Sequence, residues 1–313
     1  MRPSHPSILL TYLLTLIPML AGSLSVLAAD PSPDEWMRGL DGKFIDFGYK
    51  ASWSPDGKRI AYSGSGPERG LKIYDVASGK IDHLVANGKD PSWRPGDGLE
   101  IAYARGGGNQ EEVRLIGVDG QNDRKVADGG MPSWSKRGTV LFYHSRKLGQ
   151  IMAAEAEDDR FAEPAPIARV TNTYYPALNP QTTRVAYIVG GKLTITEQLT
   201  GNEQKSWIIP GAQTGIPAWS HDGKLVSASG FGGTDQAELT LLNPATGQSA
   251  RLAGNGYLMP AWSPDGKQIV VDHRPKNAEW SIWLFPASKL DELTWSNQAL
   301  SSTDVAPDHR PQK

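Results

Sequence analysis

One six-residue segment, Trp-Ser-Pro-Asp-Gly-Lys, occurs twice in this chain, at positions 53–58 and 262–267. Degenerate copies lie between the two, and each begins at a tryptophan or a leucine. The residues that begin the copies are spaced by 40, 41, 44, 41 and 43 positions and are Trp53, Trp93, Trp134, Leu178, Trp219 and Trp262. A period of about 40 residues is typical of repeat proteins in which each repeat is one supersecondary unit. The chain must therefore fold as an array of similar units.

The repeats have the composition of β-strands. In the first repeat, the runs Ile60–Tyr62, Leu71–Val76 and Ile81–Leu84 are separated by turn residues. Such short runs indicate strands, and no helical periodicity competes with them. In the turn after the anchor, Pro55 presets one φ angle and Gly57 supplies a positive one. The sequence predicts an all-β fold, a six-bladed β-propeller of four-stranded antiparallel blades. An open solenoid with two capped ends is the alternative.

The combined repeat pattern, Pro-x-Trp-Ser-Pro-Asp-Gly-Lys-x-Ile-Ala-Tyr, resembles the repeat of TolB-type β-propellers. It covers about residues 43–295. The resemblance implies a propeller fold and suggests partners in the cell envelope. TolB itself carries an α/β domain before its propeller, and the stretch before residue 43 is too short to form one.

A closed ring requires its first and last blades to be joined, because open sheet edges would otherwise remain. The run Phe44–Phe47 lies where the strand before Trp53 is expected, and it alternates apolar and polar residues. We predict that it is the outermost strand of blade six, with Leu290–Trp295 as the alternative. The predicted organisation is a signal peptide at 1–29, a lead-in at 30–42, the propeller at 43–295 and a loosely held polar tail at 296–313.

The first 29 residues have the layout of a secretory signal peptide. Arg2 is followed by an apolar stretch, Ile8–Leu20, and by small residues that end at Ala28 and Ala29. The apolar stretch is short for a membrane span, so we expect cleavage after Ala28 or Ala29 and no stable membrane insertion; an uncleaved anchor is the alternative. Leu20–Ser23 resembles a lipoprotein box with Ser in place of Cys, which excludes acylation there. The predicted location is periplasmic or secreted.

Composition excludes several classes of function. The chain has no cysteine, and therefore no disulfide, thiol nucleophile or thiolate metal site. Its formal net charge is −2, and loss of Arg2 with the leader would make it −3, so nothing favours a nucleic-acid partner. The roughly 285 residues that remain suit one six-bladed ring, and we expect a monomer.

The candidate binding surface is the mouth of the central channel. Two sets of loops meet there: those joining the second and third strands of each blade, and those joining each blade to the next. Binding residues concentrate on loops carried by a rigid scaffold. Arginine recognises carboxylates and tyrosine offers contact area with a polar group. The candidate binding residues are Tyr49, Arg69, Arg105, His144, Arg146, Tyr174, Tyr175, Tyr257, His273 and Arg274.

The blade-to-blade loops also contribute Lys89 and Asp90 to the mouth. The assignment is weakened by acidic residues such as Glu68, Glu111 and Glu279, which lie among the cations. Ordinary solvated loops would look similar. The anchor tryptophans recur in register, and we expect them to form the core between blades.

Catalytic signatures are absent from the sequence. There is no Gly-x-Ser-x-Gly elbow, Walker loop, His-Glu-x-x-His or EF-hand loop. Strand alternation points His144 and His273 to different faces, so they do not make a metal site. We assign no catalytic residue, metal or cofactor, although whether the chain is an enzyme stays open. The leading hypothesis is a non-catalytic scaffold that binds a protein or peptide partner in the cell envelope. The alternatives are a lyase-like propeller acting on anionic polysaccharide and a sensor of a small ligand.

Overall fold

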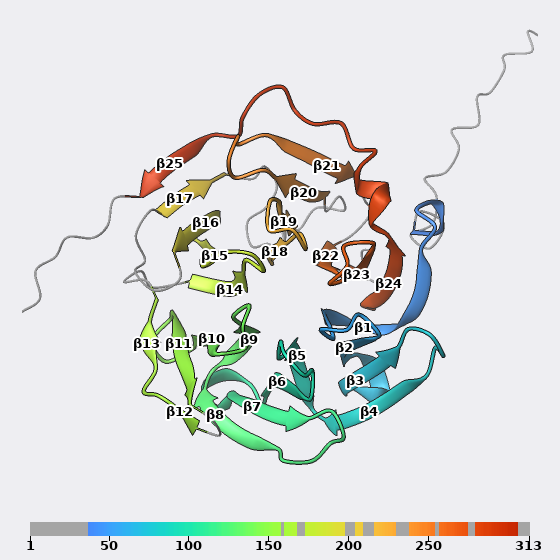
Figure 1. Ribbon diagram of the computed structural model, residues 1–313, viewed down its shortest axis with the longest axis vertical. Coiled ribbons are helices and arrows are strands. Elements are labelled where there is room, and N and C mark those ends of the chain that lie inside the picture. Colours follow the sequence, from blue (N-terminus) through green and yellow to red (C-terminus); the bar gives the residue numbers. More distant parts are fainter. Residues whose placement is uncertain are drawn as a thin grey trace, which may run out of the picture. The chain divides into compact units, whose positions relative to one another are not determined.

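The protein is described by a computed structural model that covers residues 37–157, 160–167, 173–197, 204–208, 216–229, 238–253, 257–274 and 279–305. These residues form an all-β fold, in which short antiparallel sheets surround a central axis (Figure 1). The named helical elements are three 3-10 turns, η1 (Gly66–Glu68), η2 (Gly108–Gln110) and η3 (Ala287–Leu290). The predicted signal peptide lies outside the described residues.

The strands form five hydrogen-bonded sheets, and the largest one divides at β1 (Lys43–Trp53) into two blades. Blade one contains the second half of β1 with β2 (Arg59–Gly64), β3 (Gly70–Asp75) and β4 (Ile81–Ala86). Blade two contains β5 (Gly88–Trp93), β6 (Glu100–Arg105), β7 (Glu112–Gly117) and β8 (Arg124–Asp128). Blade three contains β9 (Gly130–Trp134), β10 (Val140–Ser145) and β11 (Gln150–Glu157), with β12 (Arg160–Phe161) and β13 (Ala165–Pro166) both paired to β11.

The remaining blades follow the same order. Blade four contains β14 (Thr173–Leu178), β15 (Arg184–Val189), β16 (Lys192–Glu197), β17 (Gln204–Trp207) and β25 (Ser302–Val305). Blade five contains β18 (Ala218–Trp219), β19 (Val226–Ser229), β20 (Glu238–Leu242) and β21 (Ser249–Ala253). Blade six contains β22 (Tyr257–Trp262), β23 (Gln268–Arg274), β24 (Ser281–Pro286) and the first half of β1. This division is consistent with the predicted six blades.

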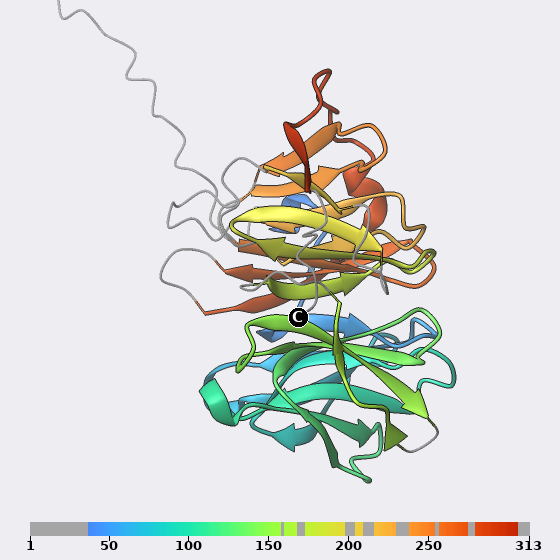
Figure 2. The same ribbon diagram turned by 90° about the vertical axis from the view of Figure 1, so that its left-hand side faces the viewer.

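The innermost strands contact one another in sequence, β1 with β5, β5 with β9, β9 with β14, β14 with β18 and β18 with β22. The series returns to its start because β22 contacts β1, which is a closed ring and not a solenoid. Seen from the side, the strands of the blades run in roughly the same direction, so their loops gather at two ends (Figure 2). We call the end with the loops between second and third strands the mouth end. The end with the Pro-Asp-Gly turns is the turn end.

Ring closure by the N-terminal strand is confirmed. Lys43 to Phe47 pair antiparallel with β24, from Lys43 opposite Leu284 to Phe47 opposite Ser281. From Gly48 onward the same strand pairs with β2. The alternative segment has another place: Trp295 makes an isolated bridge to Ala250 of β21.

The C-terminal tail differs from the prediction in one part. Ser302 to Val305 form β25, which pairs with β17 at the outer edge of blade four, from Ser302 opposite Trp207 to Val305 opposite Gln204. The tail was expected to be loosely held because it is polar. Main-chain hydrogen bonds to an open sheet edge need no apolar side chain, and they account for the difference.

The core lies between blades. Each of the six buried apolar clusters combines residues of two neighbouring blades; one of them joins Trp53 and Ile60 of blade one to Val270 and Ile282 of blade six. The Trp53 indole also donates to the Ala261 carbonyl of blade six at 3.0 Å. The anchor tryptophans therefore belong to the inter-blade core, as predicted.

The repeated turn is held by a small set of hydrogen bonds. Ser54 Oγ donates to Asp56 Oδ1 at 2.6 Å and accepts from the Arg59 amide at 2.9 Å. Gly57 takes φ +69°, a conformation that glycine adopts without steric cost. The same bonds recur at Ser220 and Ser263. These turns fix the turn end of the channel.

Candidate functional site

The third residue before each anchor has an unusual backbone in blades one to four. Lys50, Asp90, Met131 and Tyr175 take φ angles of 57°, 53°, 56° and 56°. Each lies where the pairing of the innermost strand shifts register. Such a bulge leaves a residue unpaired and re-aims its side chain. The conformation costs about 1–2 kcal/mol in a residue other than glycine, and it recurs around the axis where the channel runs.

A cavity of about 420 Å³ occupies the channel and is lined by all six innermost strands. The wall includes the prolines two positions before the anchors: Pro91, Pro132, Pro176, Pro217 and Pro260. At the turn end the lining includes the exposed residues Gln181, His221 and Pro264, so the cavity opens there. Pockets of this size and apolar character are typical of small-ligand sites.

Lys50 and Asp272 are the charged residues that line this cavity. Asp272 is completely buried, and its Oδ2 accepts a hydrogen bond from the Lys50 main-chain amide. Its Oδ1 has no hydrogen-bond partner within the described parts of the chain. Burial raises the pKa of Asp272 to about 7, although the main-chain amides of Lys50 and Ala51 and the charge of Lys50 oppose the shift. Burial also lowers the pKa of the Lys50 ammonium, against the influence of Asp90 and Asp272.

Asp90 interacts electrostatically with both Lys50 and Asp272 and lies toward the mouth end of the channel. Burial raises the pKa of Asp90, opposed by Lys50 and Lys89. Burial, with Asp90 adding to the effect, raises the pKa of Tyr49 to about 12 and also raises the pKa of Tyr175. Burial therefore favours the neutral forms of Tyr49, Tyr175 and Asp90 at this end of the channel.

Glu111, near Asp90, forms ion pairs with two cations, Lys89 and Arg146. Its carboxylate, 2% exposed, lies 2.6 Å from Lys89 Nζ and accepts a hydrogen bond from Arg146 Nε. Burial would raise the pKa of Glu111, but the bonds from Arg146 and Lys89 outweigh it and hold the pKa below its usual value. Glu111 is thus an ionised carboxylate with two cationic partners. We refer to Lys50, Lys89, Asp90, Glu111, Arg146 and Asp272 as the channel charge cluster.

Five of the predicted binding residues lie at or beside this cluster. Arg146 belongs to it, and Tyr49 and Tyr175 interact electrostatically with Asp90. The His144 and Tyr174 rings lie 4.8 Å apart, and those of Tyr174 and Tyr175 lie 6.4 Å apart. His144 is 2% exposed, and burial, reinforced by Arg146, lowers its pKa. At neutral pH His144 is therefore uncharged.

Other predicted residues are placed elsewhere. Arg69 is exposed, and its Nε donates to the Gly66 carbonyl at 3.4 Å. The Arg274 guanidinium lies over the Trp280 ring at 5.6 Å. His273 is completely buried, and its main-chain carbonyl accepts from Ser281 Oγ. Tyr257 begins β22 opposite Arg274, and its side chain lies outside the described part.

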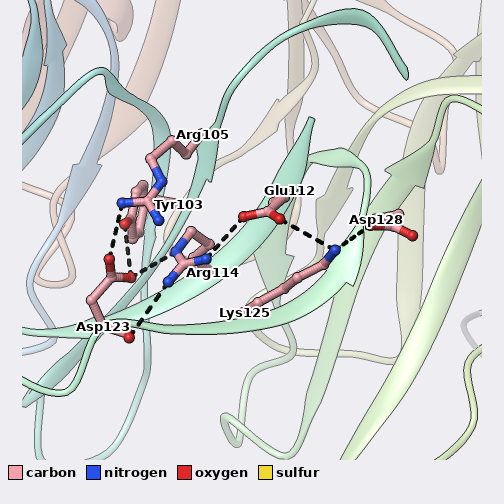
Figure 3. Close-up of polar contacts among 7 residues, drawn as sticks. All are labelled: Tyr103, Arg105, Glu112, Arg114, Asp123, Lys125 and Asp128. Carbon is pink, nitrogen blue, oxygen red and sulfur yellow. Dashed lines mark hydrogen bonds and ion pairs between the residues drawn. The ribbon is translucent and has the colours of Figure 1, made fainter. Parts of the chain in front are cut away.

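Arg105 belongs to an ion-pair network within blade two (Figure 3). Asp123 pairs with Arg105 at 3.1 Å and accepts from Tyr103 and Arg114, each at 2.8 Å. The network extends from Arg114 through Glu112 to Lys125 and Asp128. Arg105 is therefore neutralised by its own blade and takes no part in the channel charge cluster.

Sequence reasoning missed Lys50 and Asp272. It placed Lys89 and Asp90 at the mouth without choosing them as binding residues, and it treated Glu111 as an ordinary charged residue of a loop. A signal was available for three of these residues. Lys50 and Asp90 share the third position before an anchor, and Asp272 is a carboxyl directly after the apolar run Ile269–Val271. A charged residue in such a run is a candidate for a buried functional group.

Within the described ranges, no three His, Asp or Glu side chains are grouped so that they could hold a metal ion. No helix in those ranges has the length and apolar character needed to cross a membrane.

Replacing Asp272 with Asn should give a stability difference that changes sign with pH. The folded state holds the Asp272 proton up to about pH 7, whereas the unfolded chain releases it near 3.8. Wild-type stability therefore falls between these values by about 4 kcal/mol on account of this group. An unpaired amide costs about 1–3 kcal/mol. We expect Asp272→Asn to be about 1–3 kcal/mol more stable than wild type at pH 8 and less stable at pH 4. Urea unfolding at both pH values measures this, and a constant difference would contradict the buried carboxyl.

Solved structures similar to this one are β-propellers of several functions. TolB from Acinetobacter baumannii matches with a TM-score of 0.54 and 14% identity, over 81% of this chain and 55% of that one. This chain therefore spans about half the length of that TolB. A gluconolactonase, XC5397 from Xanthomonas campestris, matches with a TM-score of 0.59 and 11% identity, over 78% and 87% of the two chains. An oligogalacturonate lyase in complex with manganese matches with a TM-score of 0.50 and 12% identity, over 79% and 91%. No protein-family model and no curated protein matches the sequence. At these identities the likeness shows the β-propeller fold alone.

Proposed function

We propose that this protein is an exported, TolB-like binding propeller that holds a protein or peptide partner of the cell envelope at the mouth end of its channel, without catalysis. The observation that carries the proposal is the channel charge cluster. Lys89 and Arg146 are cations that flank Glu111, whereas burial pushes Asp90 and Asp272 toward their neutral forms and also lowers the pKa of Lys50. Glu111 is the carboxylate of the cluster whose pKa is held below its usual value. The excess of positive charge favours an acidic segment of the partner.

The tyrosines support the same kind of partner. Tyr49, Tyr174 and Tyr175 are partly buried beside the cluster, and burial raises the pKa of Tyr49 and of Tyr175, so both keep their phenol protons. Rings of this kind bury much area on binding at little cost in side-chain entropy. Arg146, with 33% of its side chain exposed, provides a guanidinium that an incoming carboxylate can reach.

Site-specific photo-crosslinking in the envelope of the native host tests where the partner binds. A photoreactive residue at Arg69 or Tyr175 reports on the mouth end, and one at the exposed Lys224 reports on the turn end. We expect adducts from the first two positions and none from Lys224. Arg146→Glu should reduce the adducts at least tenfold, about 1.4 kcal/mol, because it places a carboxylate beside Glu111.

The matched control is Arg137→Glu, which reverses an exposed charge in the turn of the same blade and should leave the adducts unchanged. Equal adducts from Lys224, or adducts that persist in Arg146→Glu, would overturn binding at the mouth. Sequencing of the exported protein from its N-terminus should give Ala29 or Asp30 as the first residue. Bound metal together with release of unsaturated sugar from an anionic polysaccharide would replace the scaffold proposal with the lyase alternative.

A further inference from the structure

The channel cavity has an unsatisfied polar group at its inner end, away from the mouth loops. Asp272 is completely buried and lines the cavity, and its Oδ1 has no partner among the described atoms. Buried polar atoms in proteins are almost always hydrogen-bonded. An isolated one in a cavity of about 420 Å³ therefore points to a ligand that supplies the missing bond.

The chemistry of the two charged residues selects the ligand. Oδ2 of Asp272 already accepts from the Lys50 amide, so a proton on this carboxyl belongs on Oδ1, where it becomes a donor. Lys50 lines the same cavity, and the charged groups that act on its ammonium are Asp90 and Asp272. A neutral carboxyl and an ammonium together present donors, and one acceptor with negative charge satisfies both.

The rest of the wall fits an apolar body. Prolines and the tryptophans Trp53, Trp93, Trp219 and Trp262 line the cavity between its inner end and the turn end. The indole N–H groups of Trp53, Trp93 and Trp219 are occupied by main-chain carbonyls. These rings therefore offer apolar surface and no free polar group. Entry is from the turn end, where Gln181 and His221 are exposed.

We propose that the channel cavity is a binding site for a small carboxylate with an apolar body, which enters at the turn end and places its carboxylate between Lys50 and Asp272. This site shares Lys50 and Asp272 with the channel charge cluster, but it is reached from the turn end and takes a small ligand, so its test does not depend on the partner site at the mouth end. The ligand carboxylate accepts one bond from the Lys50 ammonium and one from the Asp272 carboxyl proton. The apolar body replaces water against the prolines and tryptophans.

Three probes of one shape test the head-group preference. These are 4-phenylbutyrate, 4-phenylbutanol and 4-phenylbutylamine, titrated against the full chain by calorimetry. We expect the carboxylate to bind at least tenfold more tightly than the alcohol or the amine. Its affinity should fall as the pH rises through about 7, because binding requires the protonated Asp272. The charged groups that act on Asp272 are Lys50 and Asp90.

Variants assign the effect to the two residues. Lys50→Met should weaken the carboxylate at least tenfold, and methionine is tolerated in this backbone conformation at the equivalent Met131. Asp272→Asn keeps a donor beside the cavity, so it should retain binding and lose the pH dependence. Ser133→Phe fills the cavity from blade three and should abolish binding of every probe. Lys224→Met, at an exposed position of the turn end, is the control and should change nothing.

Thermal unfolding checks that each variant is folded. If one of the three site variants does not fold, either of the others can be used for the test. The proposal is overturned if the three probes bind equally, if none binds at about 10 mM, or if Lys50→Met leaves the carboxylate affinity unchanged. Crosslinking at the mouth end is a separate measurement. Failure of the probes to bind in the cavity would therefore not contradict partner binding at the mouth end, and the reverse also holds.

Discussion

A chain that begins at Gly48, and so lacks Lys43–Phe47, should lose cooperative folding. This segment closes the ring by pairing with β24. It also places Ile45, 8% exposed, in the cluster that joins blades six and one. Burial of Ile45 contributes about 1.5–3 kcal/mol and each ladder hydrogen bond about 0.5–1.5 kcal/mol. With about one ladder bond for each of the four paired residues, the sum is about 3.5–9 kcal/mol, which is comparable to the whole stability of a typical domain.

The control is a chain that begins at Trp36, which loses the predicted leader and keeps the closing strand. We expect it to unfold in one transition and to elute as a monomer. The shorter chain should show a broad transition or none, and it should associate through the exposed edge of β24. Denaturant unfolding and size-exclusion chromatography measure both effects. Equal unfolding midpoints for the two chains would show that another element closes the ring.

Asp46→Ala should destabilise the protein by about 3–5 kcal/mol, because it removes the partner of a buried charge. Lys72 Nζ lies 2.9 Å from Asp46 Oδ2, and its side chain is 3% exposed. The same carboxylate accepts from the Tyr62 hydroxyl at 2.6 Å. Glu68, the other carboxylate near Lys72, is 3.3 Å away and 71% exposed, so it compensates the loss only in part. The free energy of unfolding from urea titration checks the value.

Two companion variants separate charge from packing. Glu68→Ala removes an exposed partner and should cost less than about 1 kcal/mol. Asp46→Ala combined with Lys72→Met removes both buried charges and should recover part of the lost stability. Burial would raise the pKa of Asp46, but bonds from Tyr62 and Lys72 hold it below 3.8. The stabilisation is present above about pH 4 and is lost as the pH falls through the lowered pKa, so the cost of Asp46→Ala should shrink in acid. A pH-independent cost would show that the carboxylate acts only by packing.

The repeat fold could be predicted because its determinants are local in sequence. The Ser-Pro-Asp-Gly turn and the anchor tryptophan carry their own hydrogen bonds and burial. The closing strand Phe44–Phe47 could be found by counting back one repeat. β25 could not, because its pairing with β17 uses main-chain groups that every sequence possesses.

The channel charge cluster was harder to predict, for a geometric reason. Lys50 and Asp272 meet across 222 positions of sequence, and only closure of the ring brings them together. The four bulge positions are occupied by Lys, Asp, Met and Tyr, so no shared residue type marks them. Arg105 was assigned to the rim by its place in a loop. The actual direction of its side chain depends on Asp123, which lies on another connection of the same blade.

In the innermost strands, the residues that pack between blades are different from the bulge residues at the channel. The wall between blades is built by the anchors and by the second and third strands, whereas Lys50, Asp90, Met131 and Tyr175 stand out of register. Evolution or a designer can therefore exchange these side chains without rebuilding the wall. In a propeller of this kind, substitutions at a few bulge positions can change which ligand the channel binds, while the scaffold of the blades stays the same.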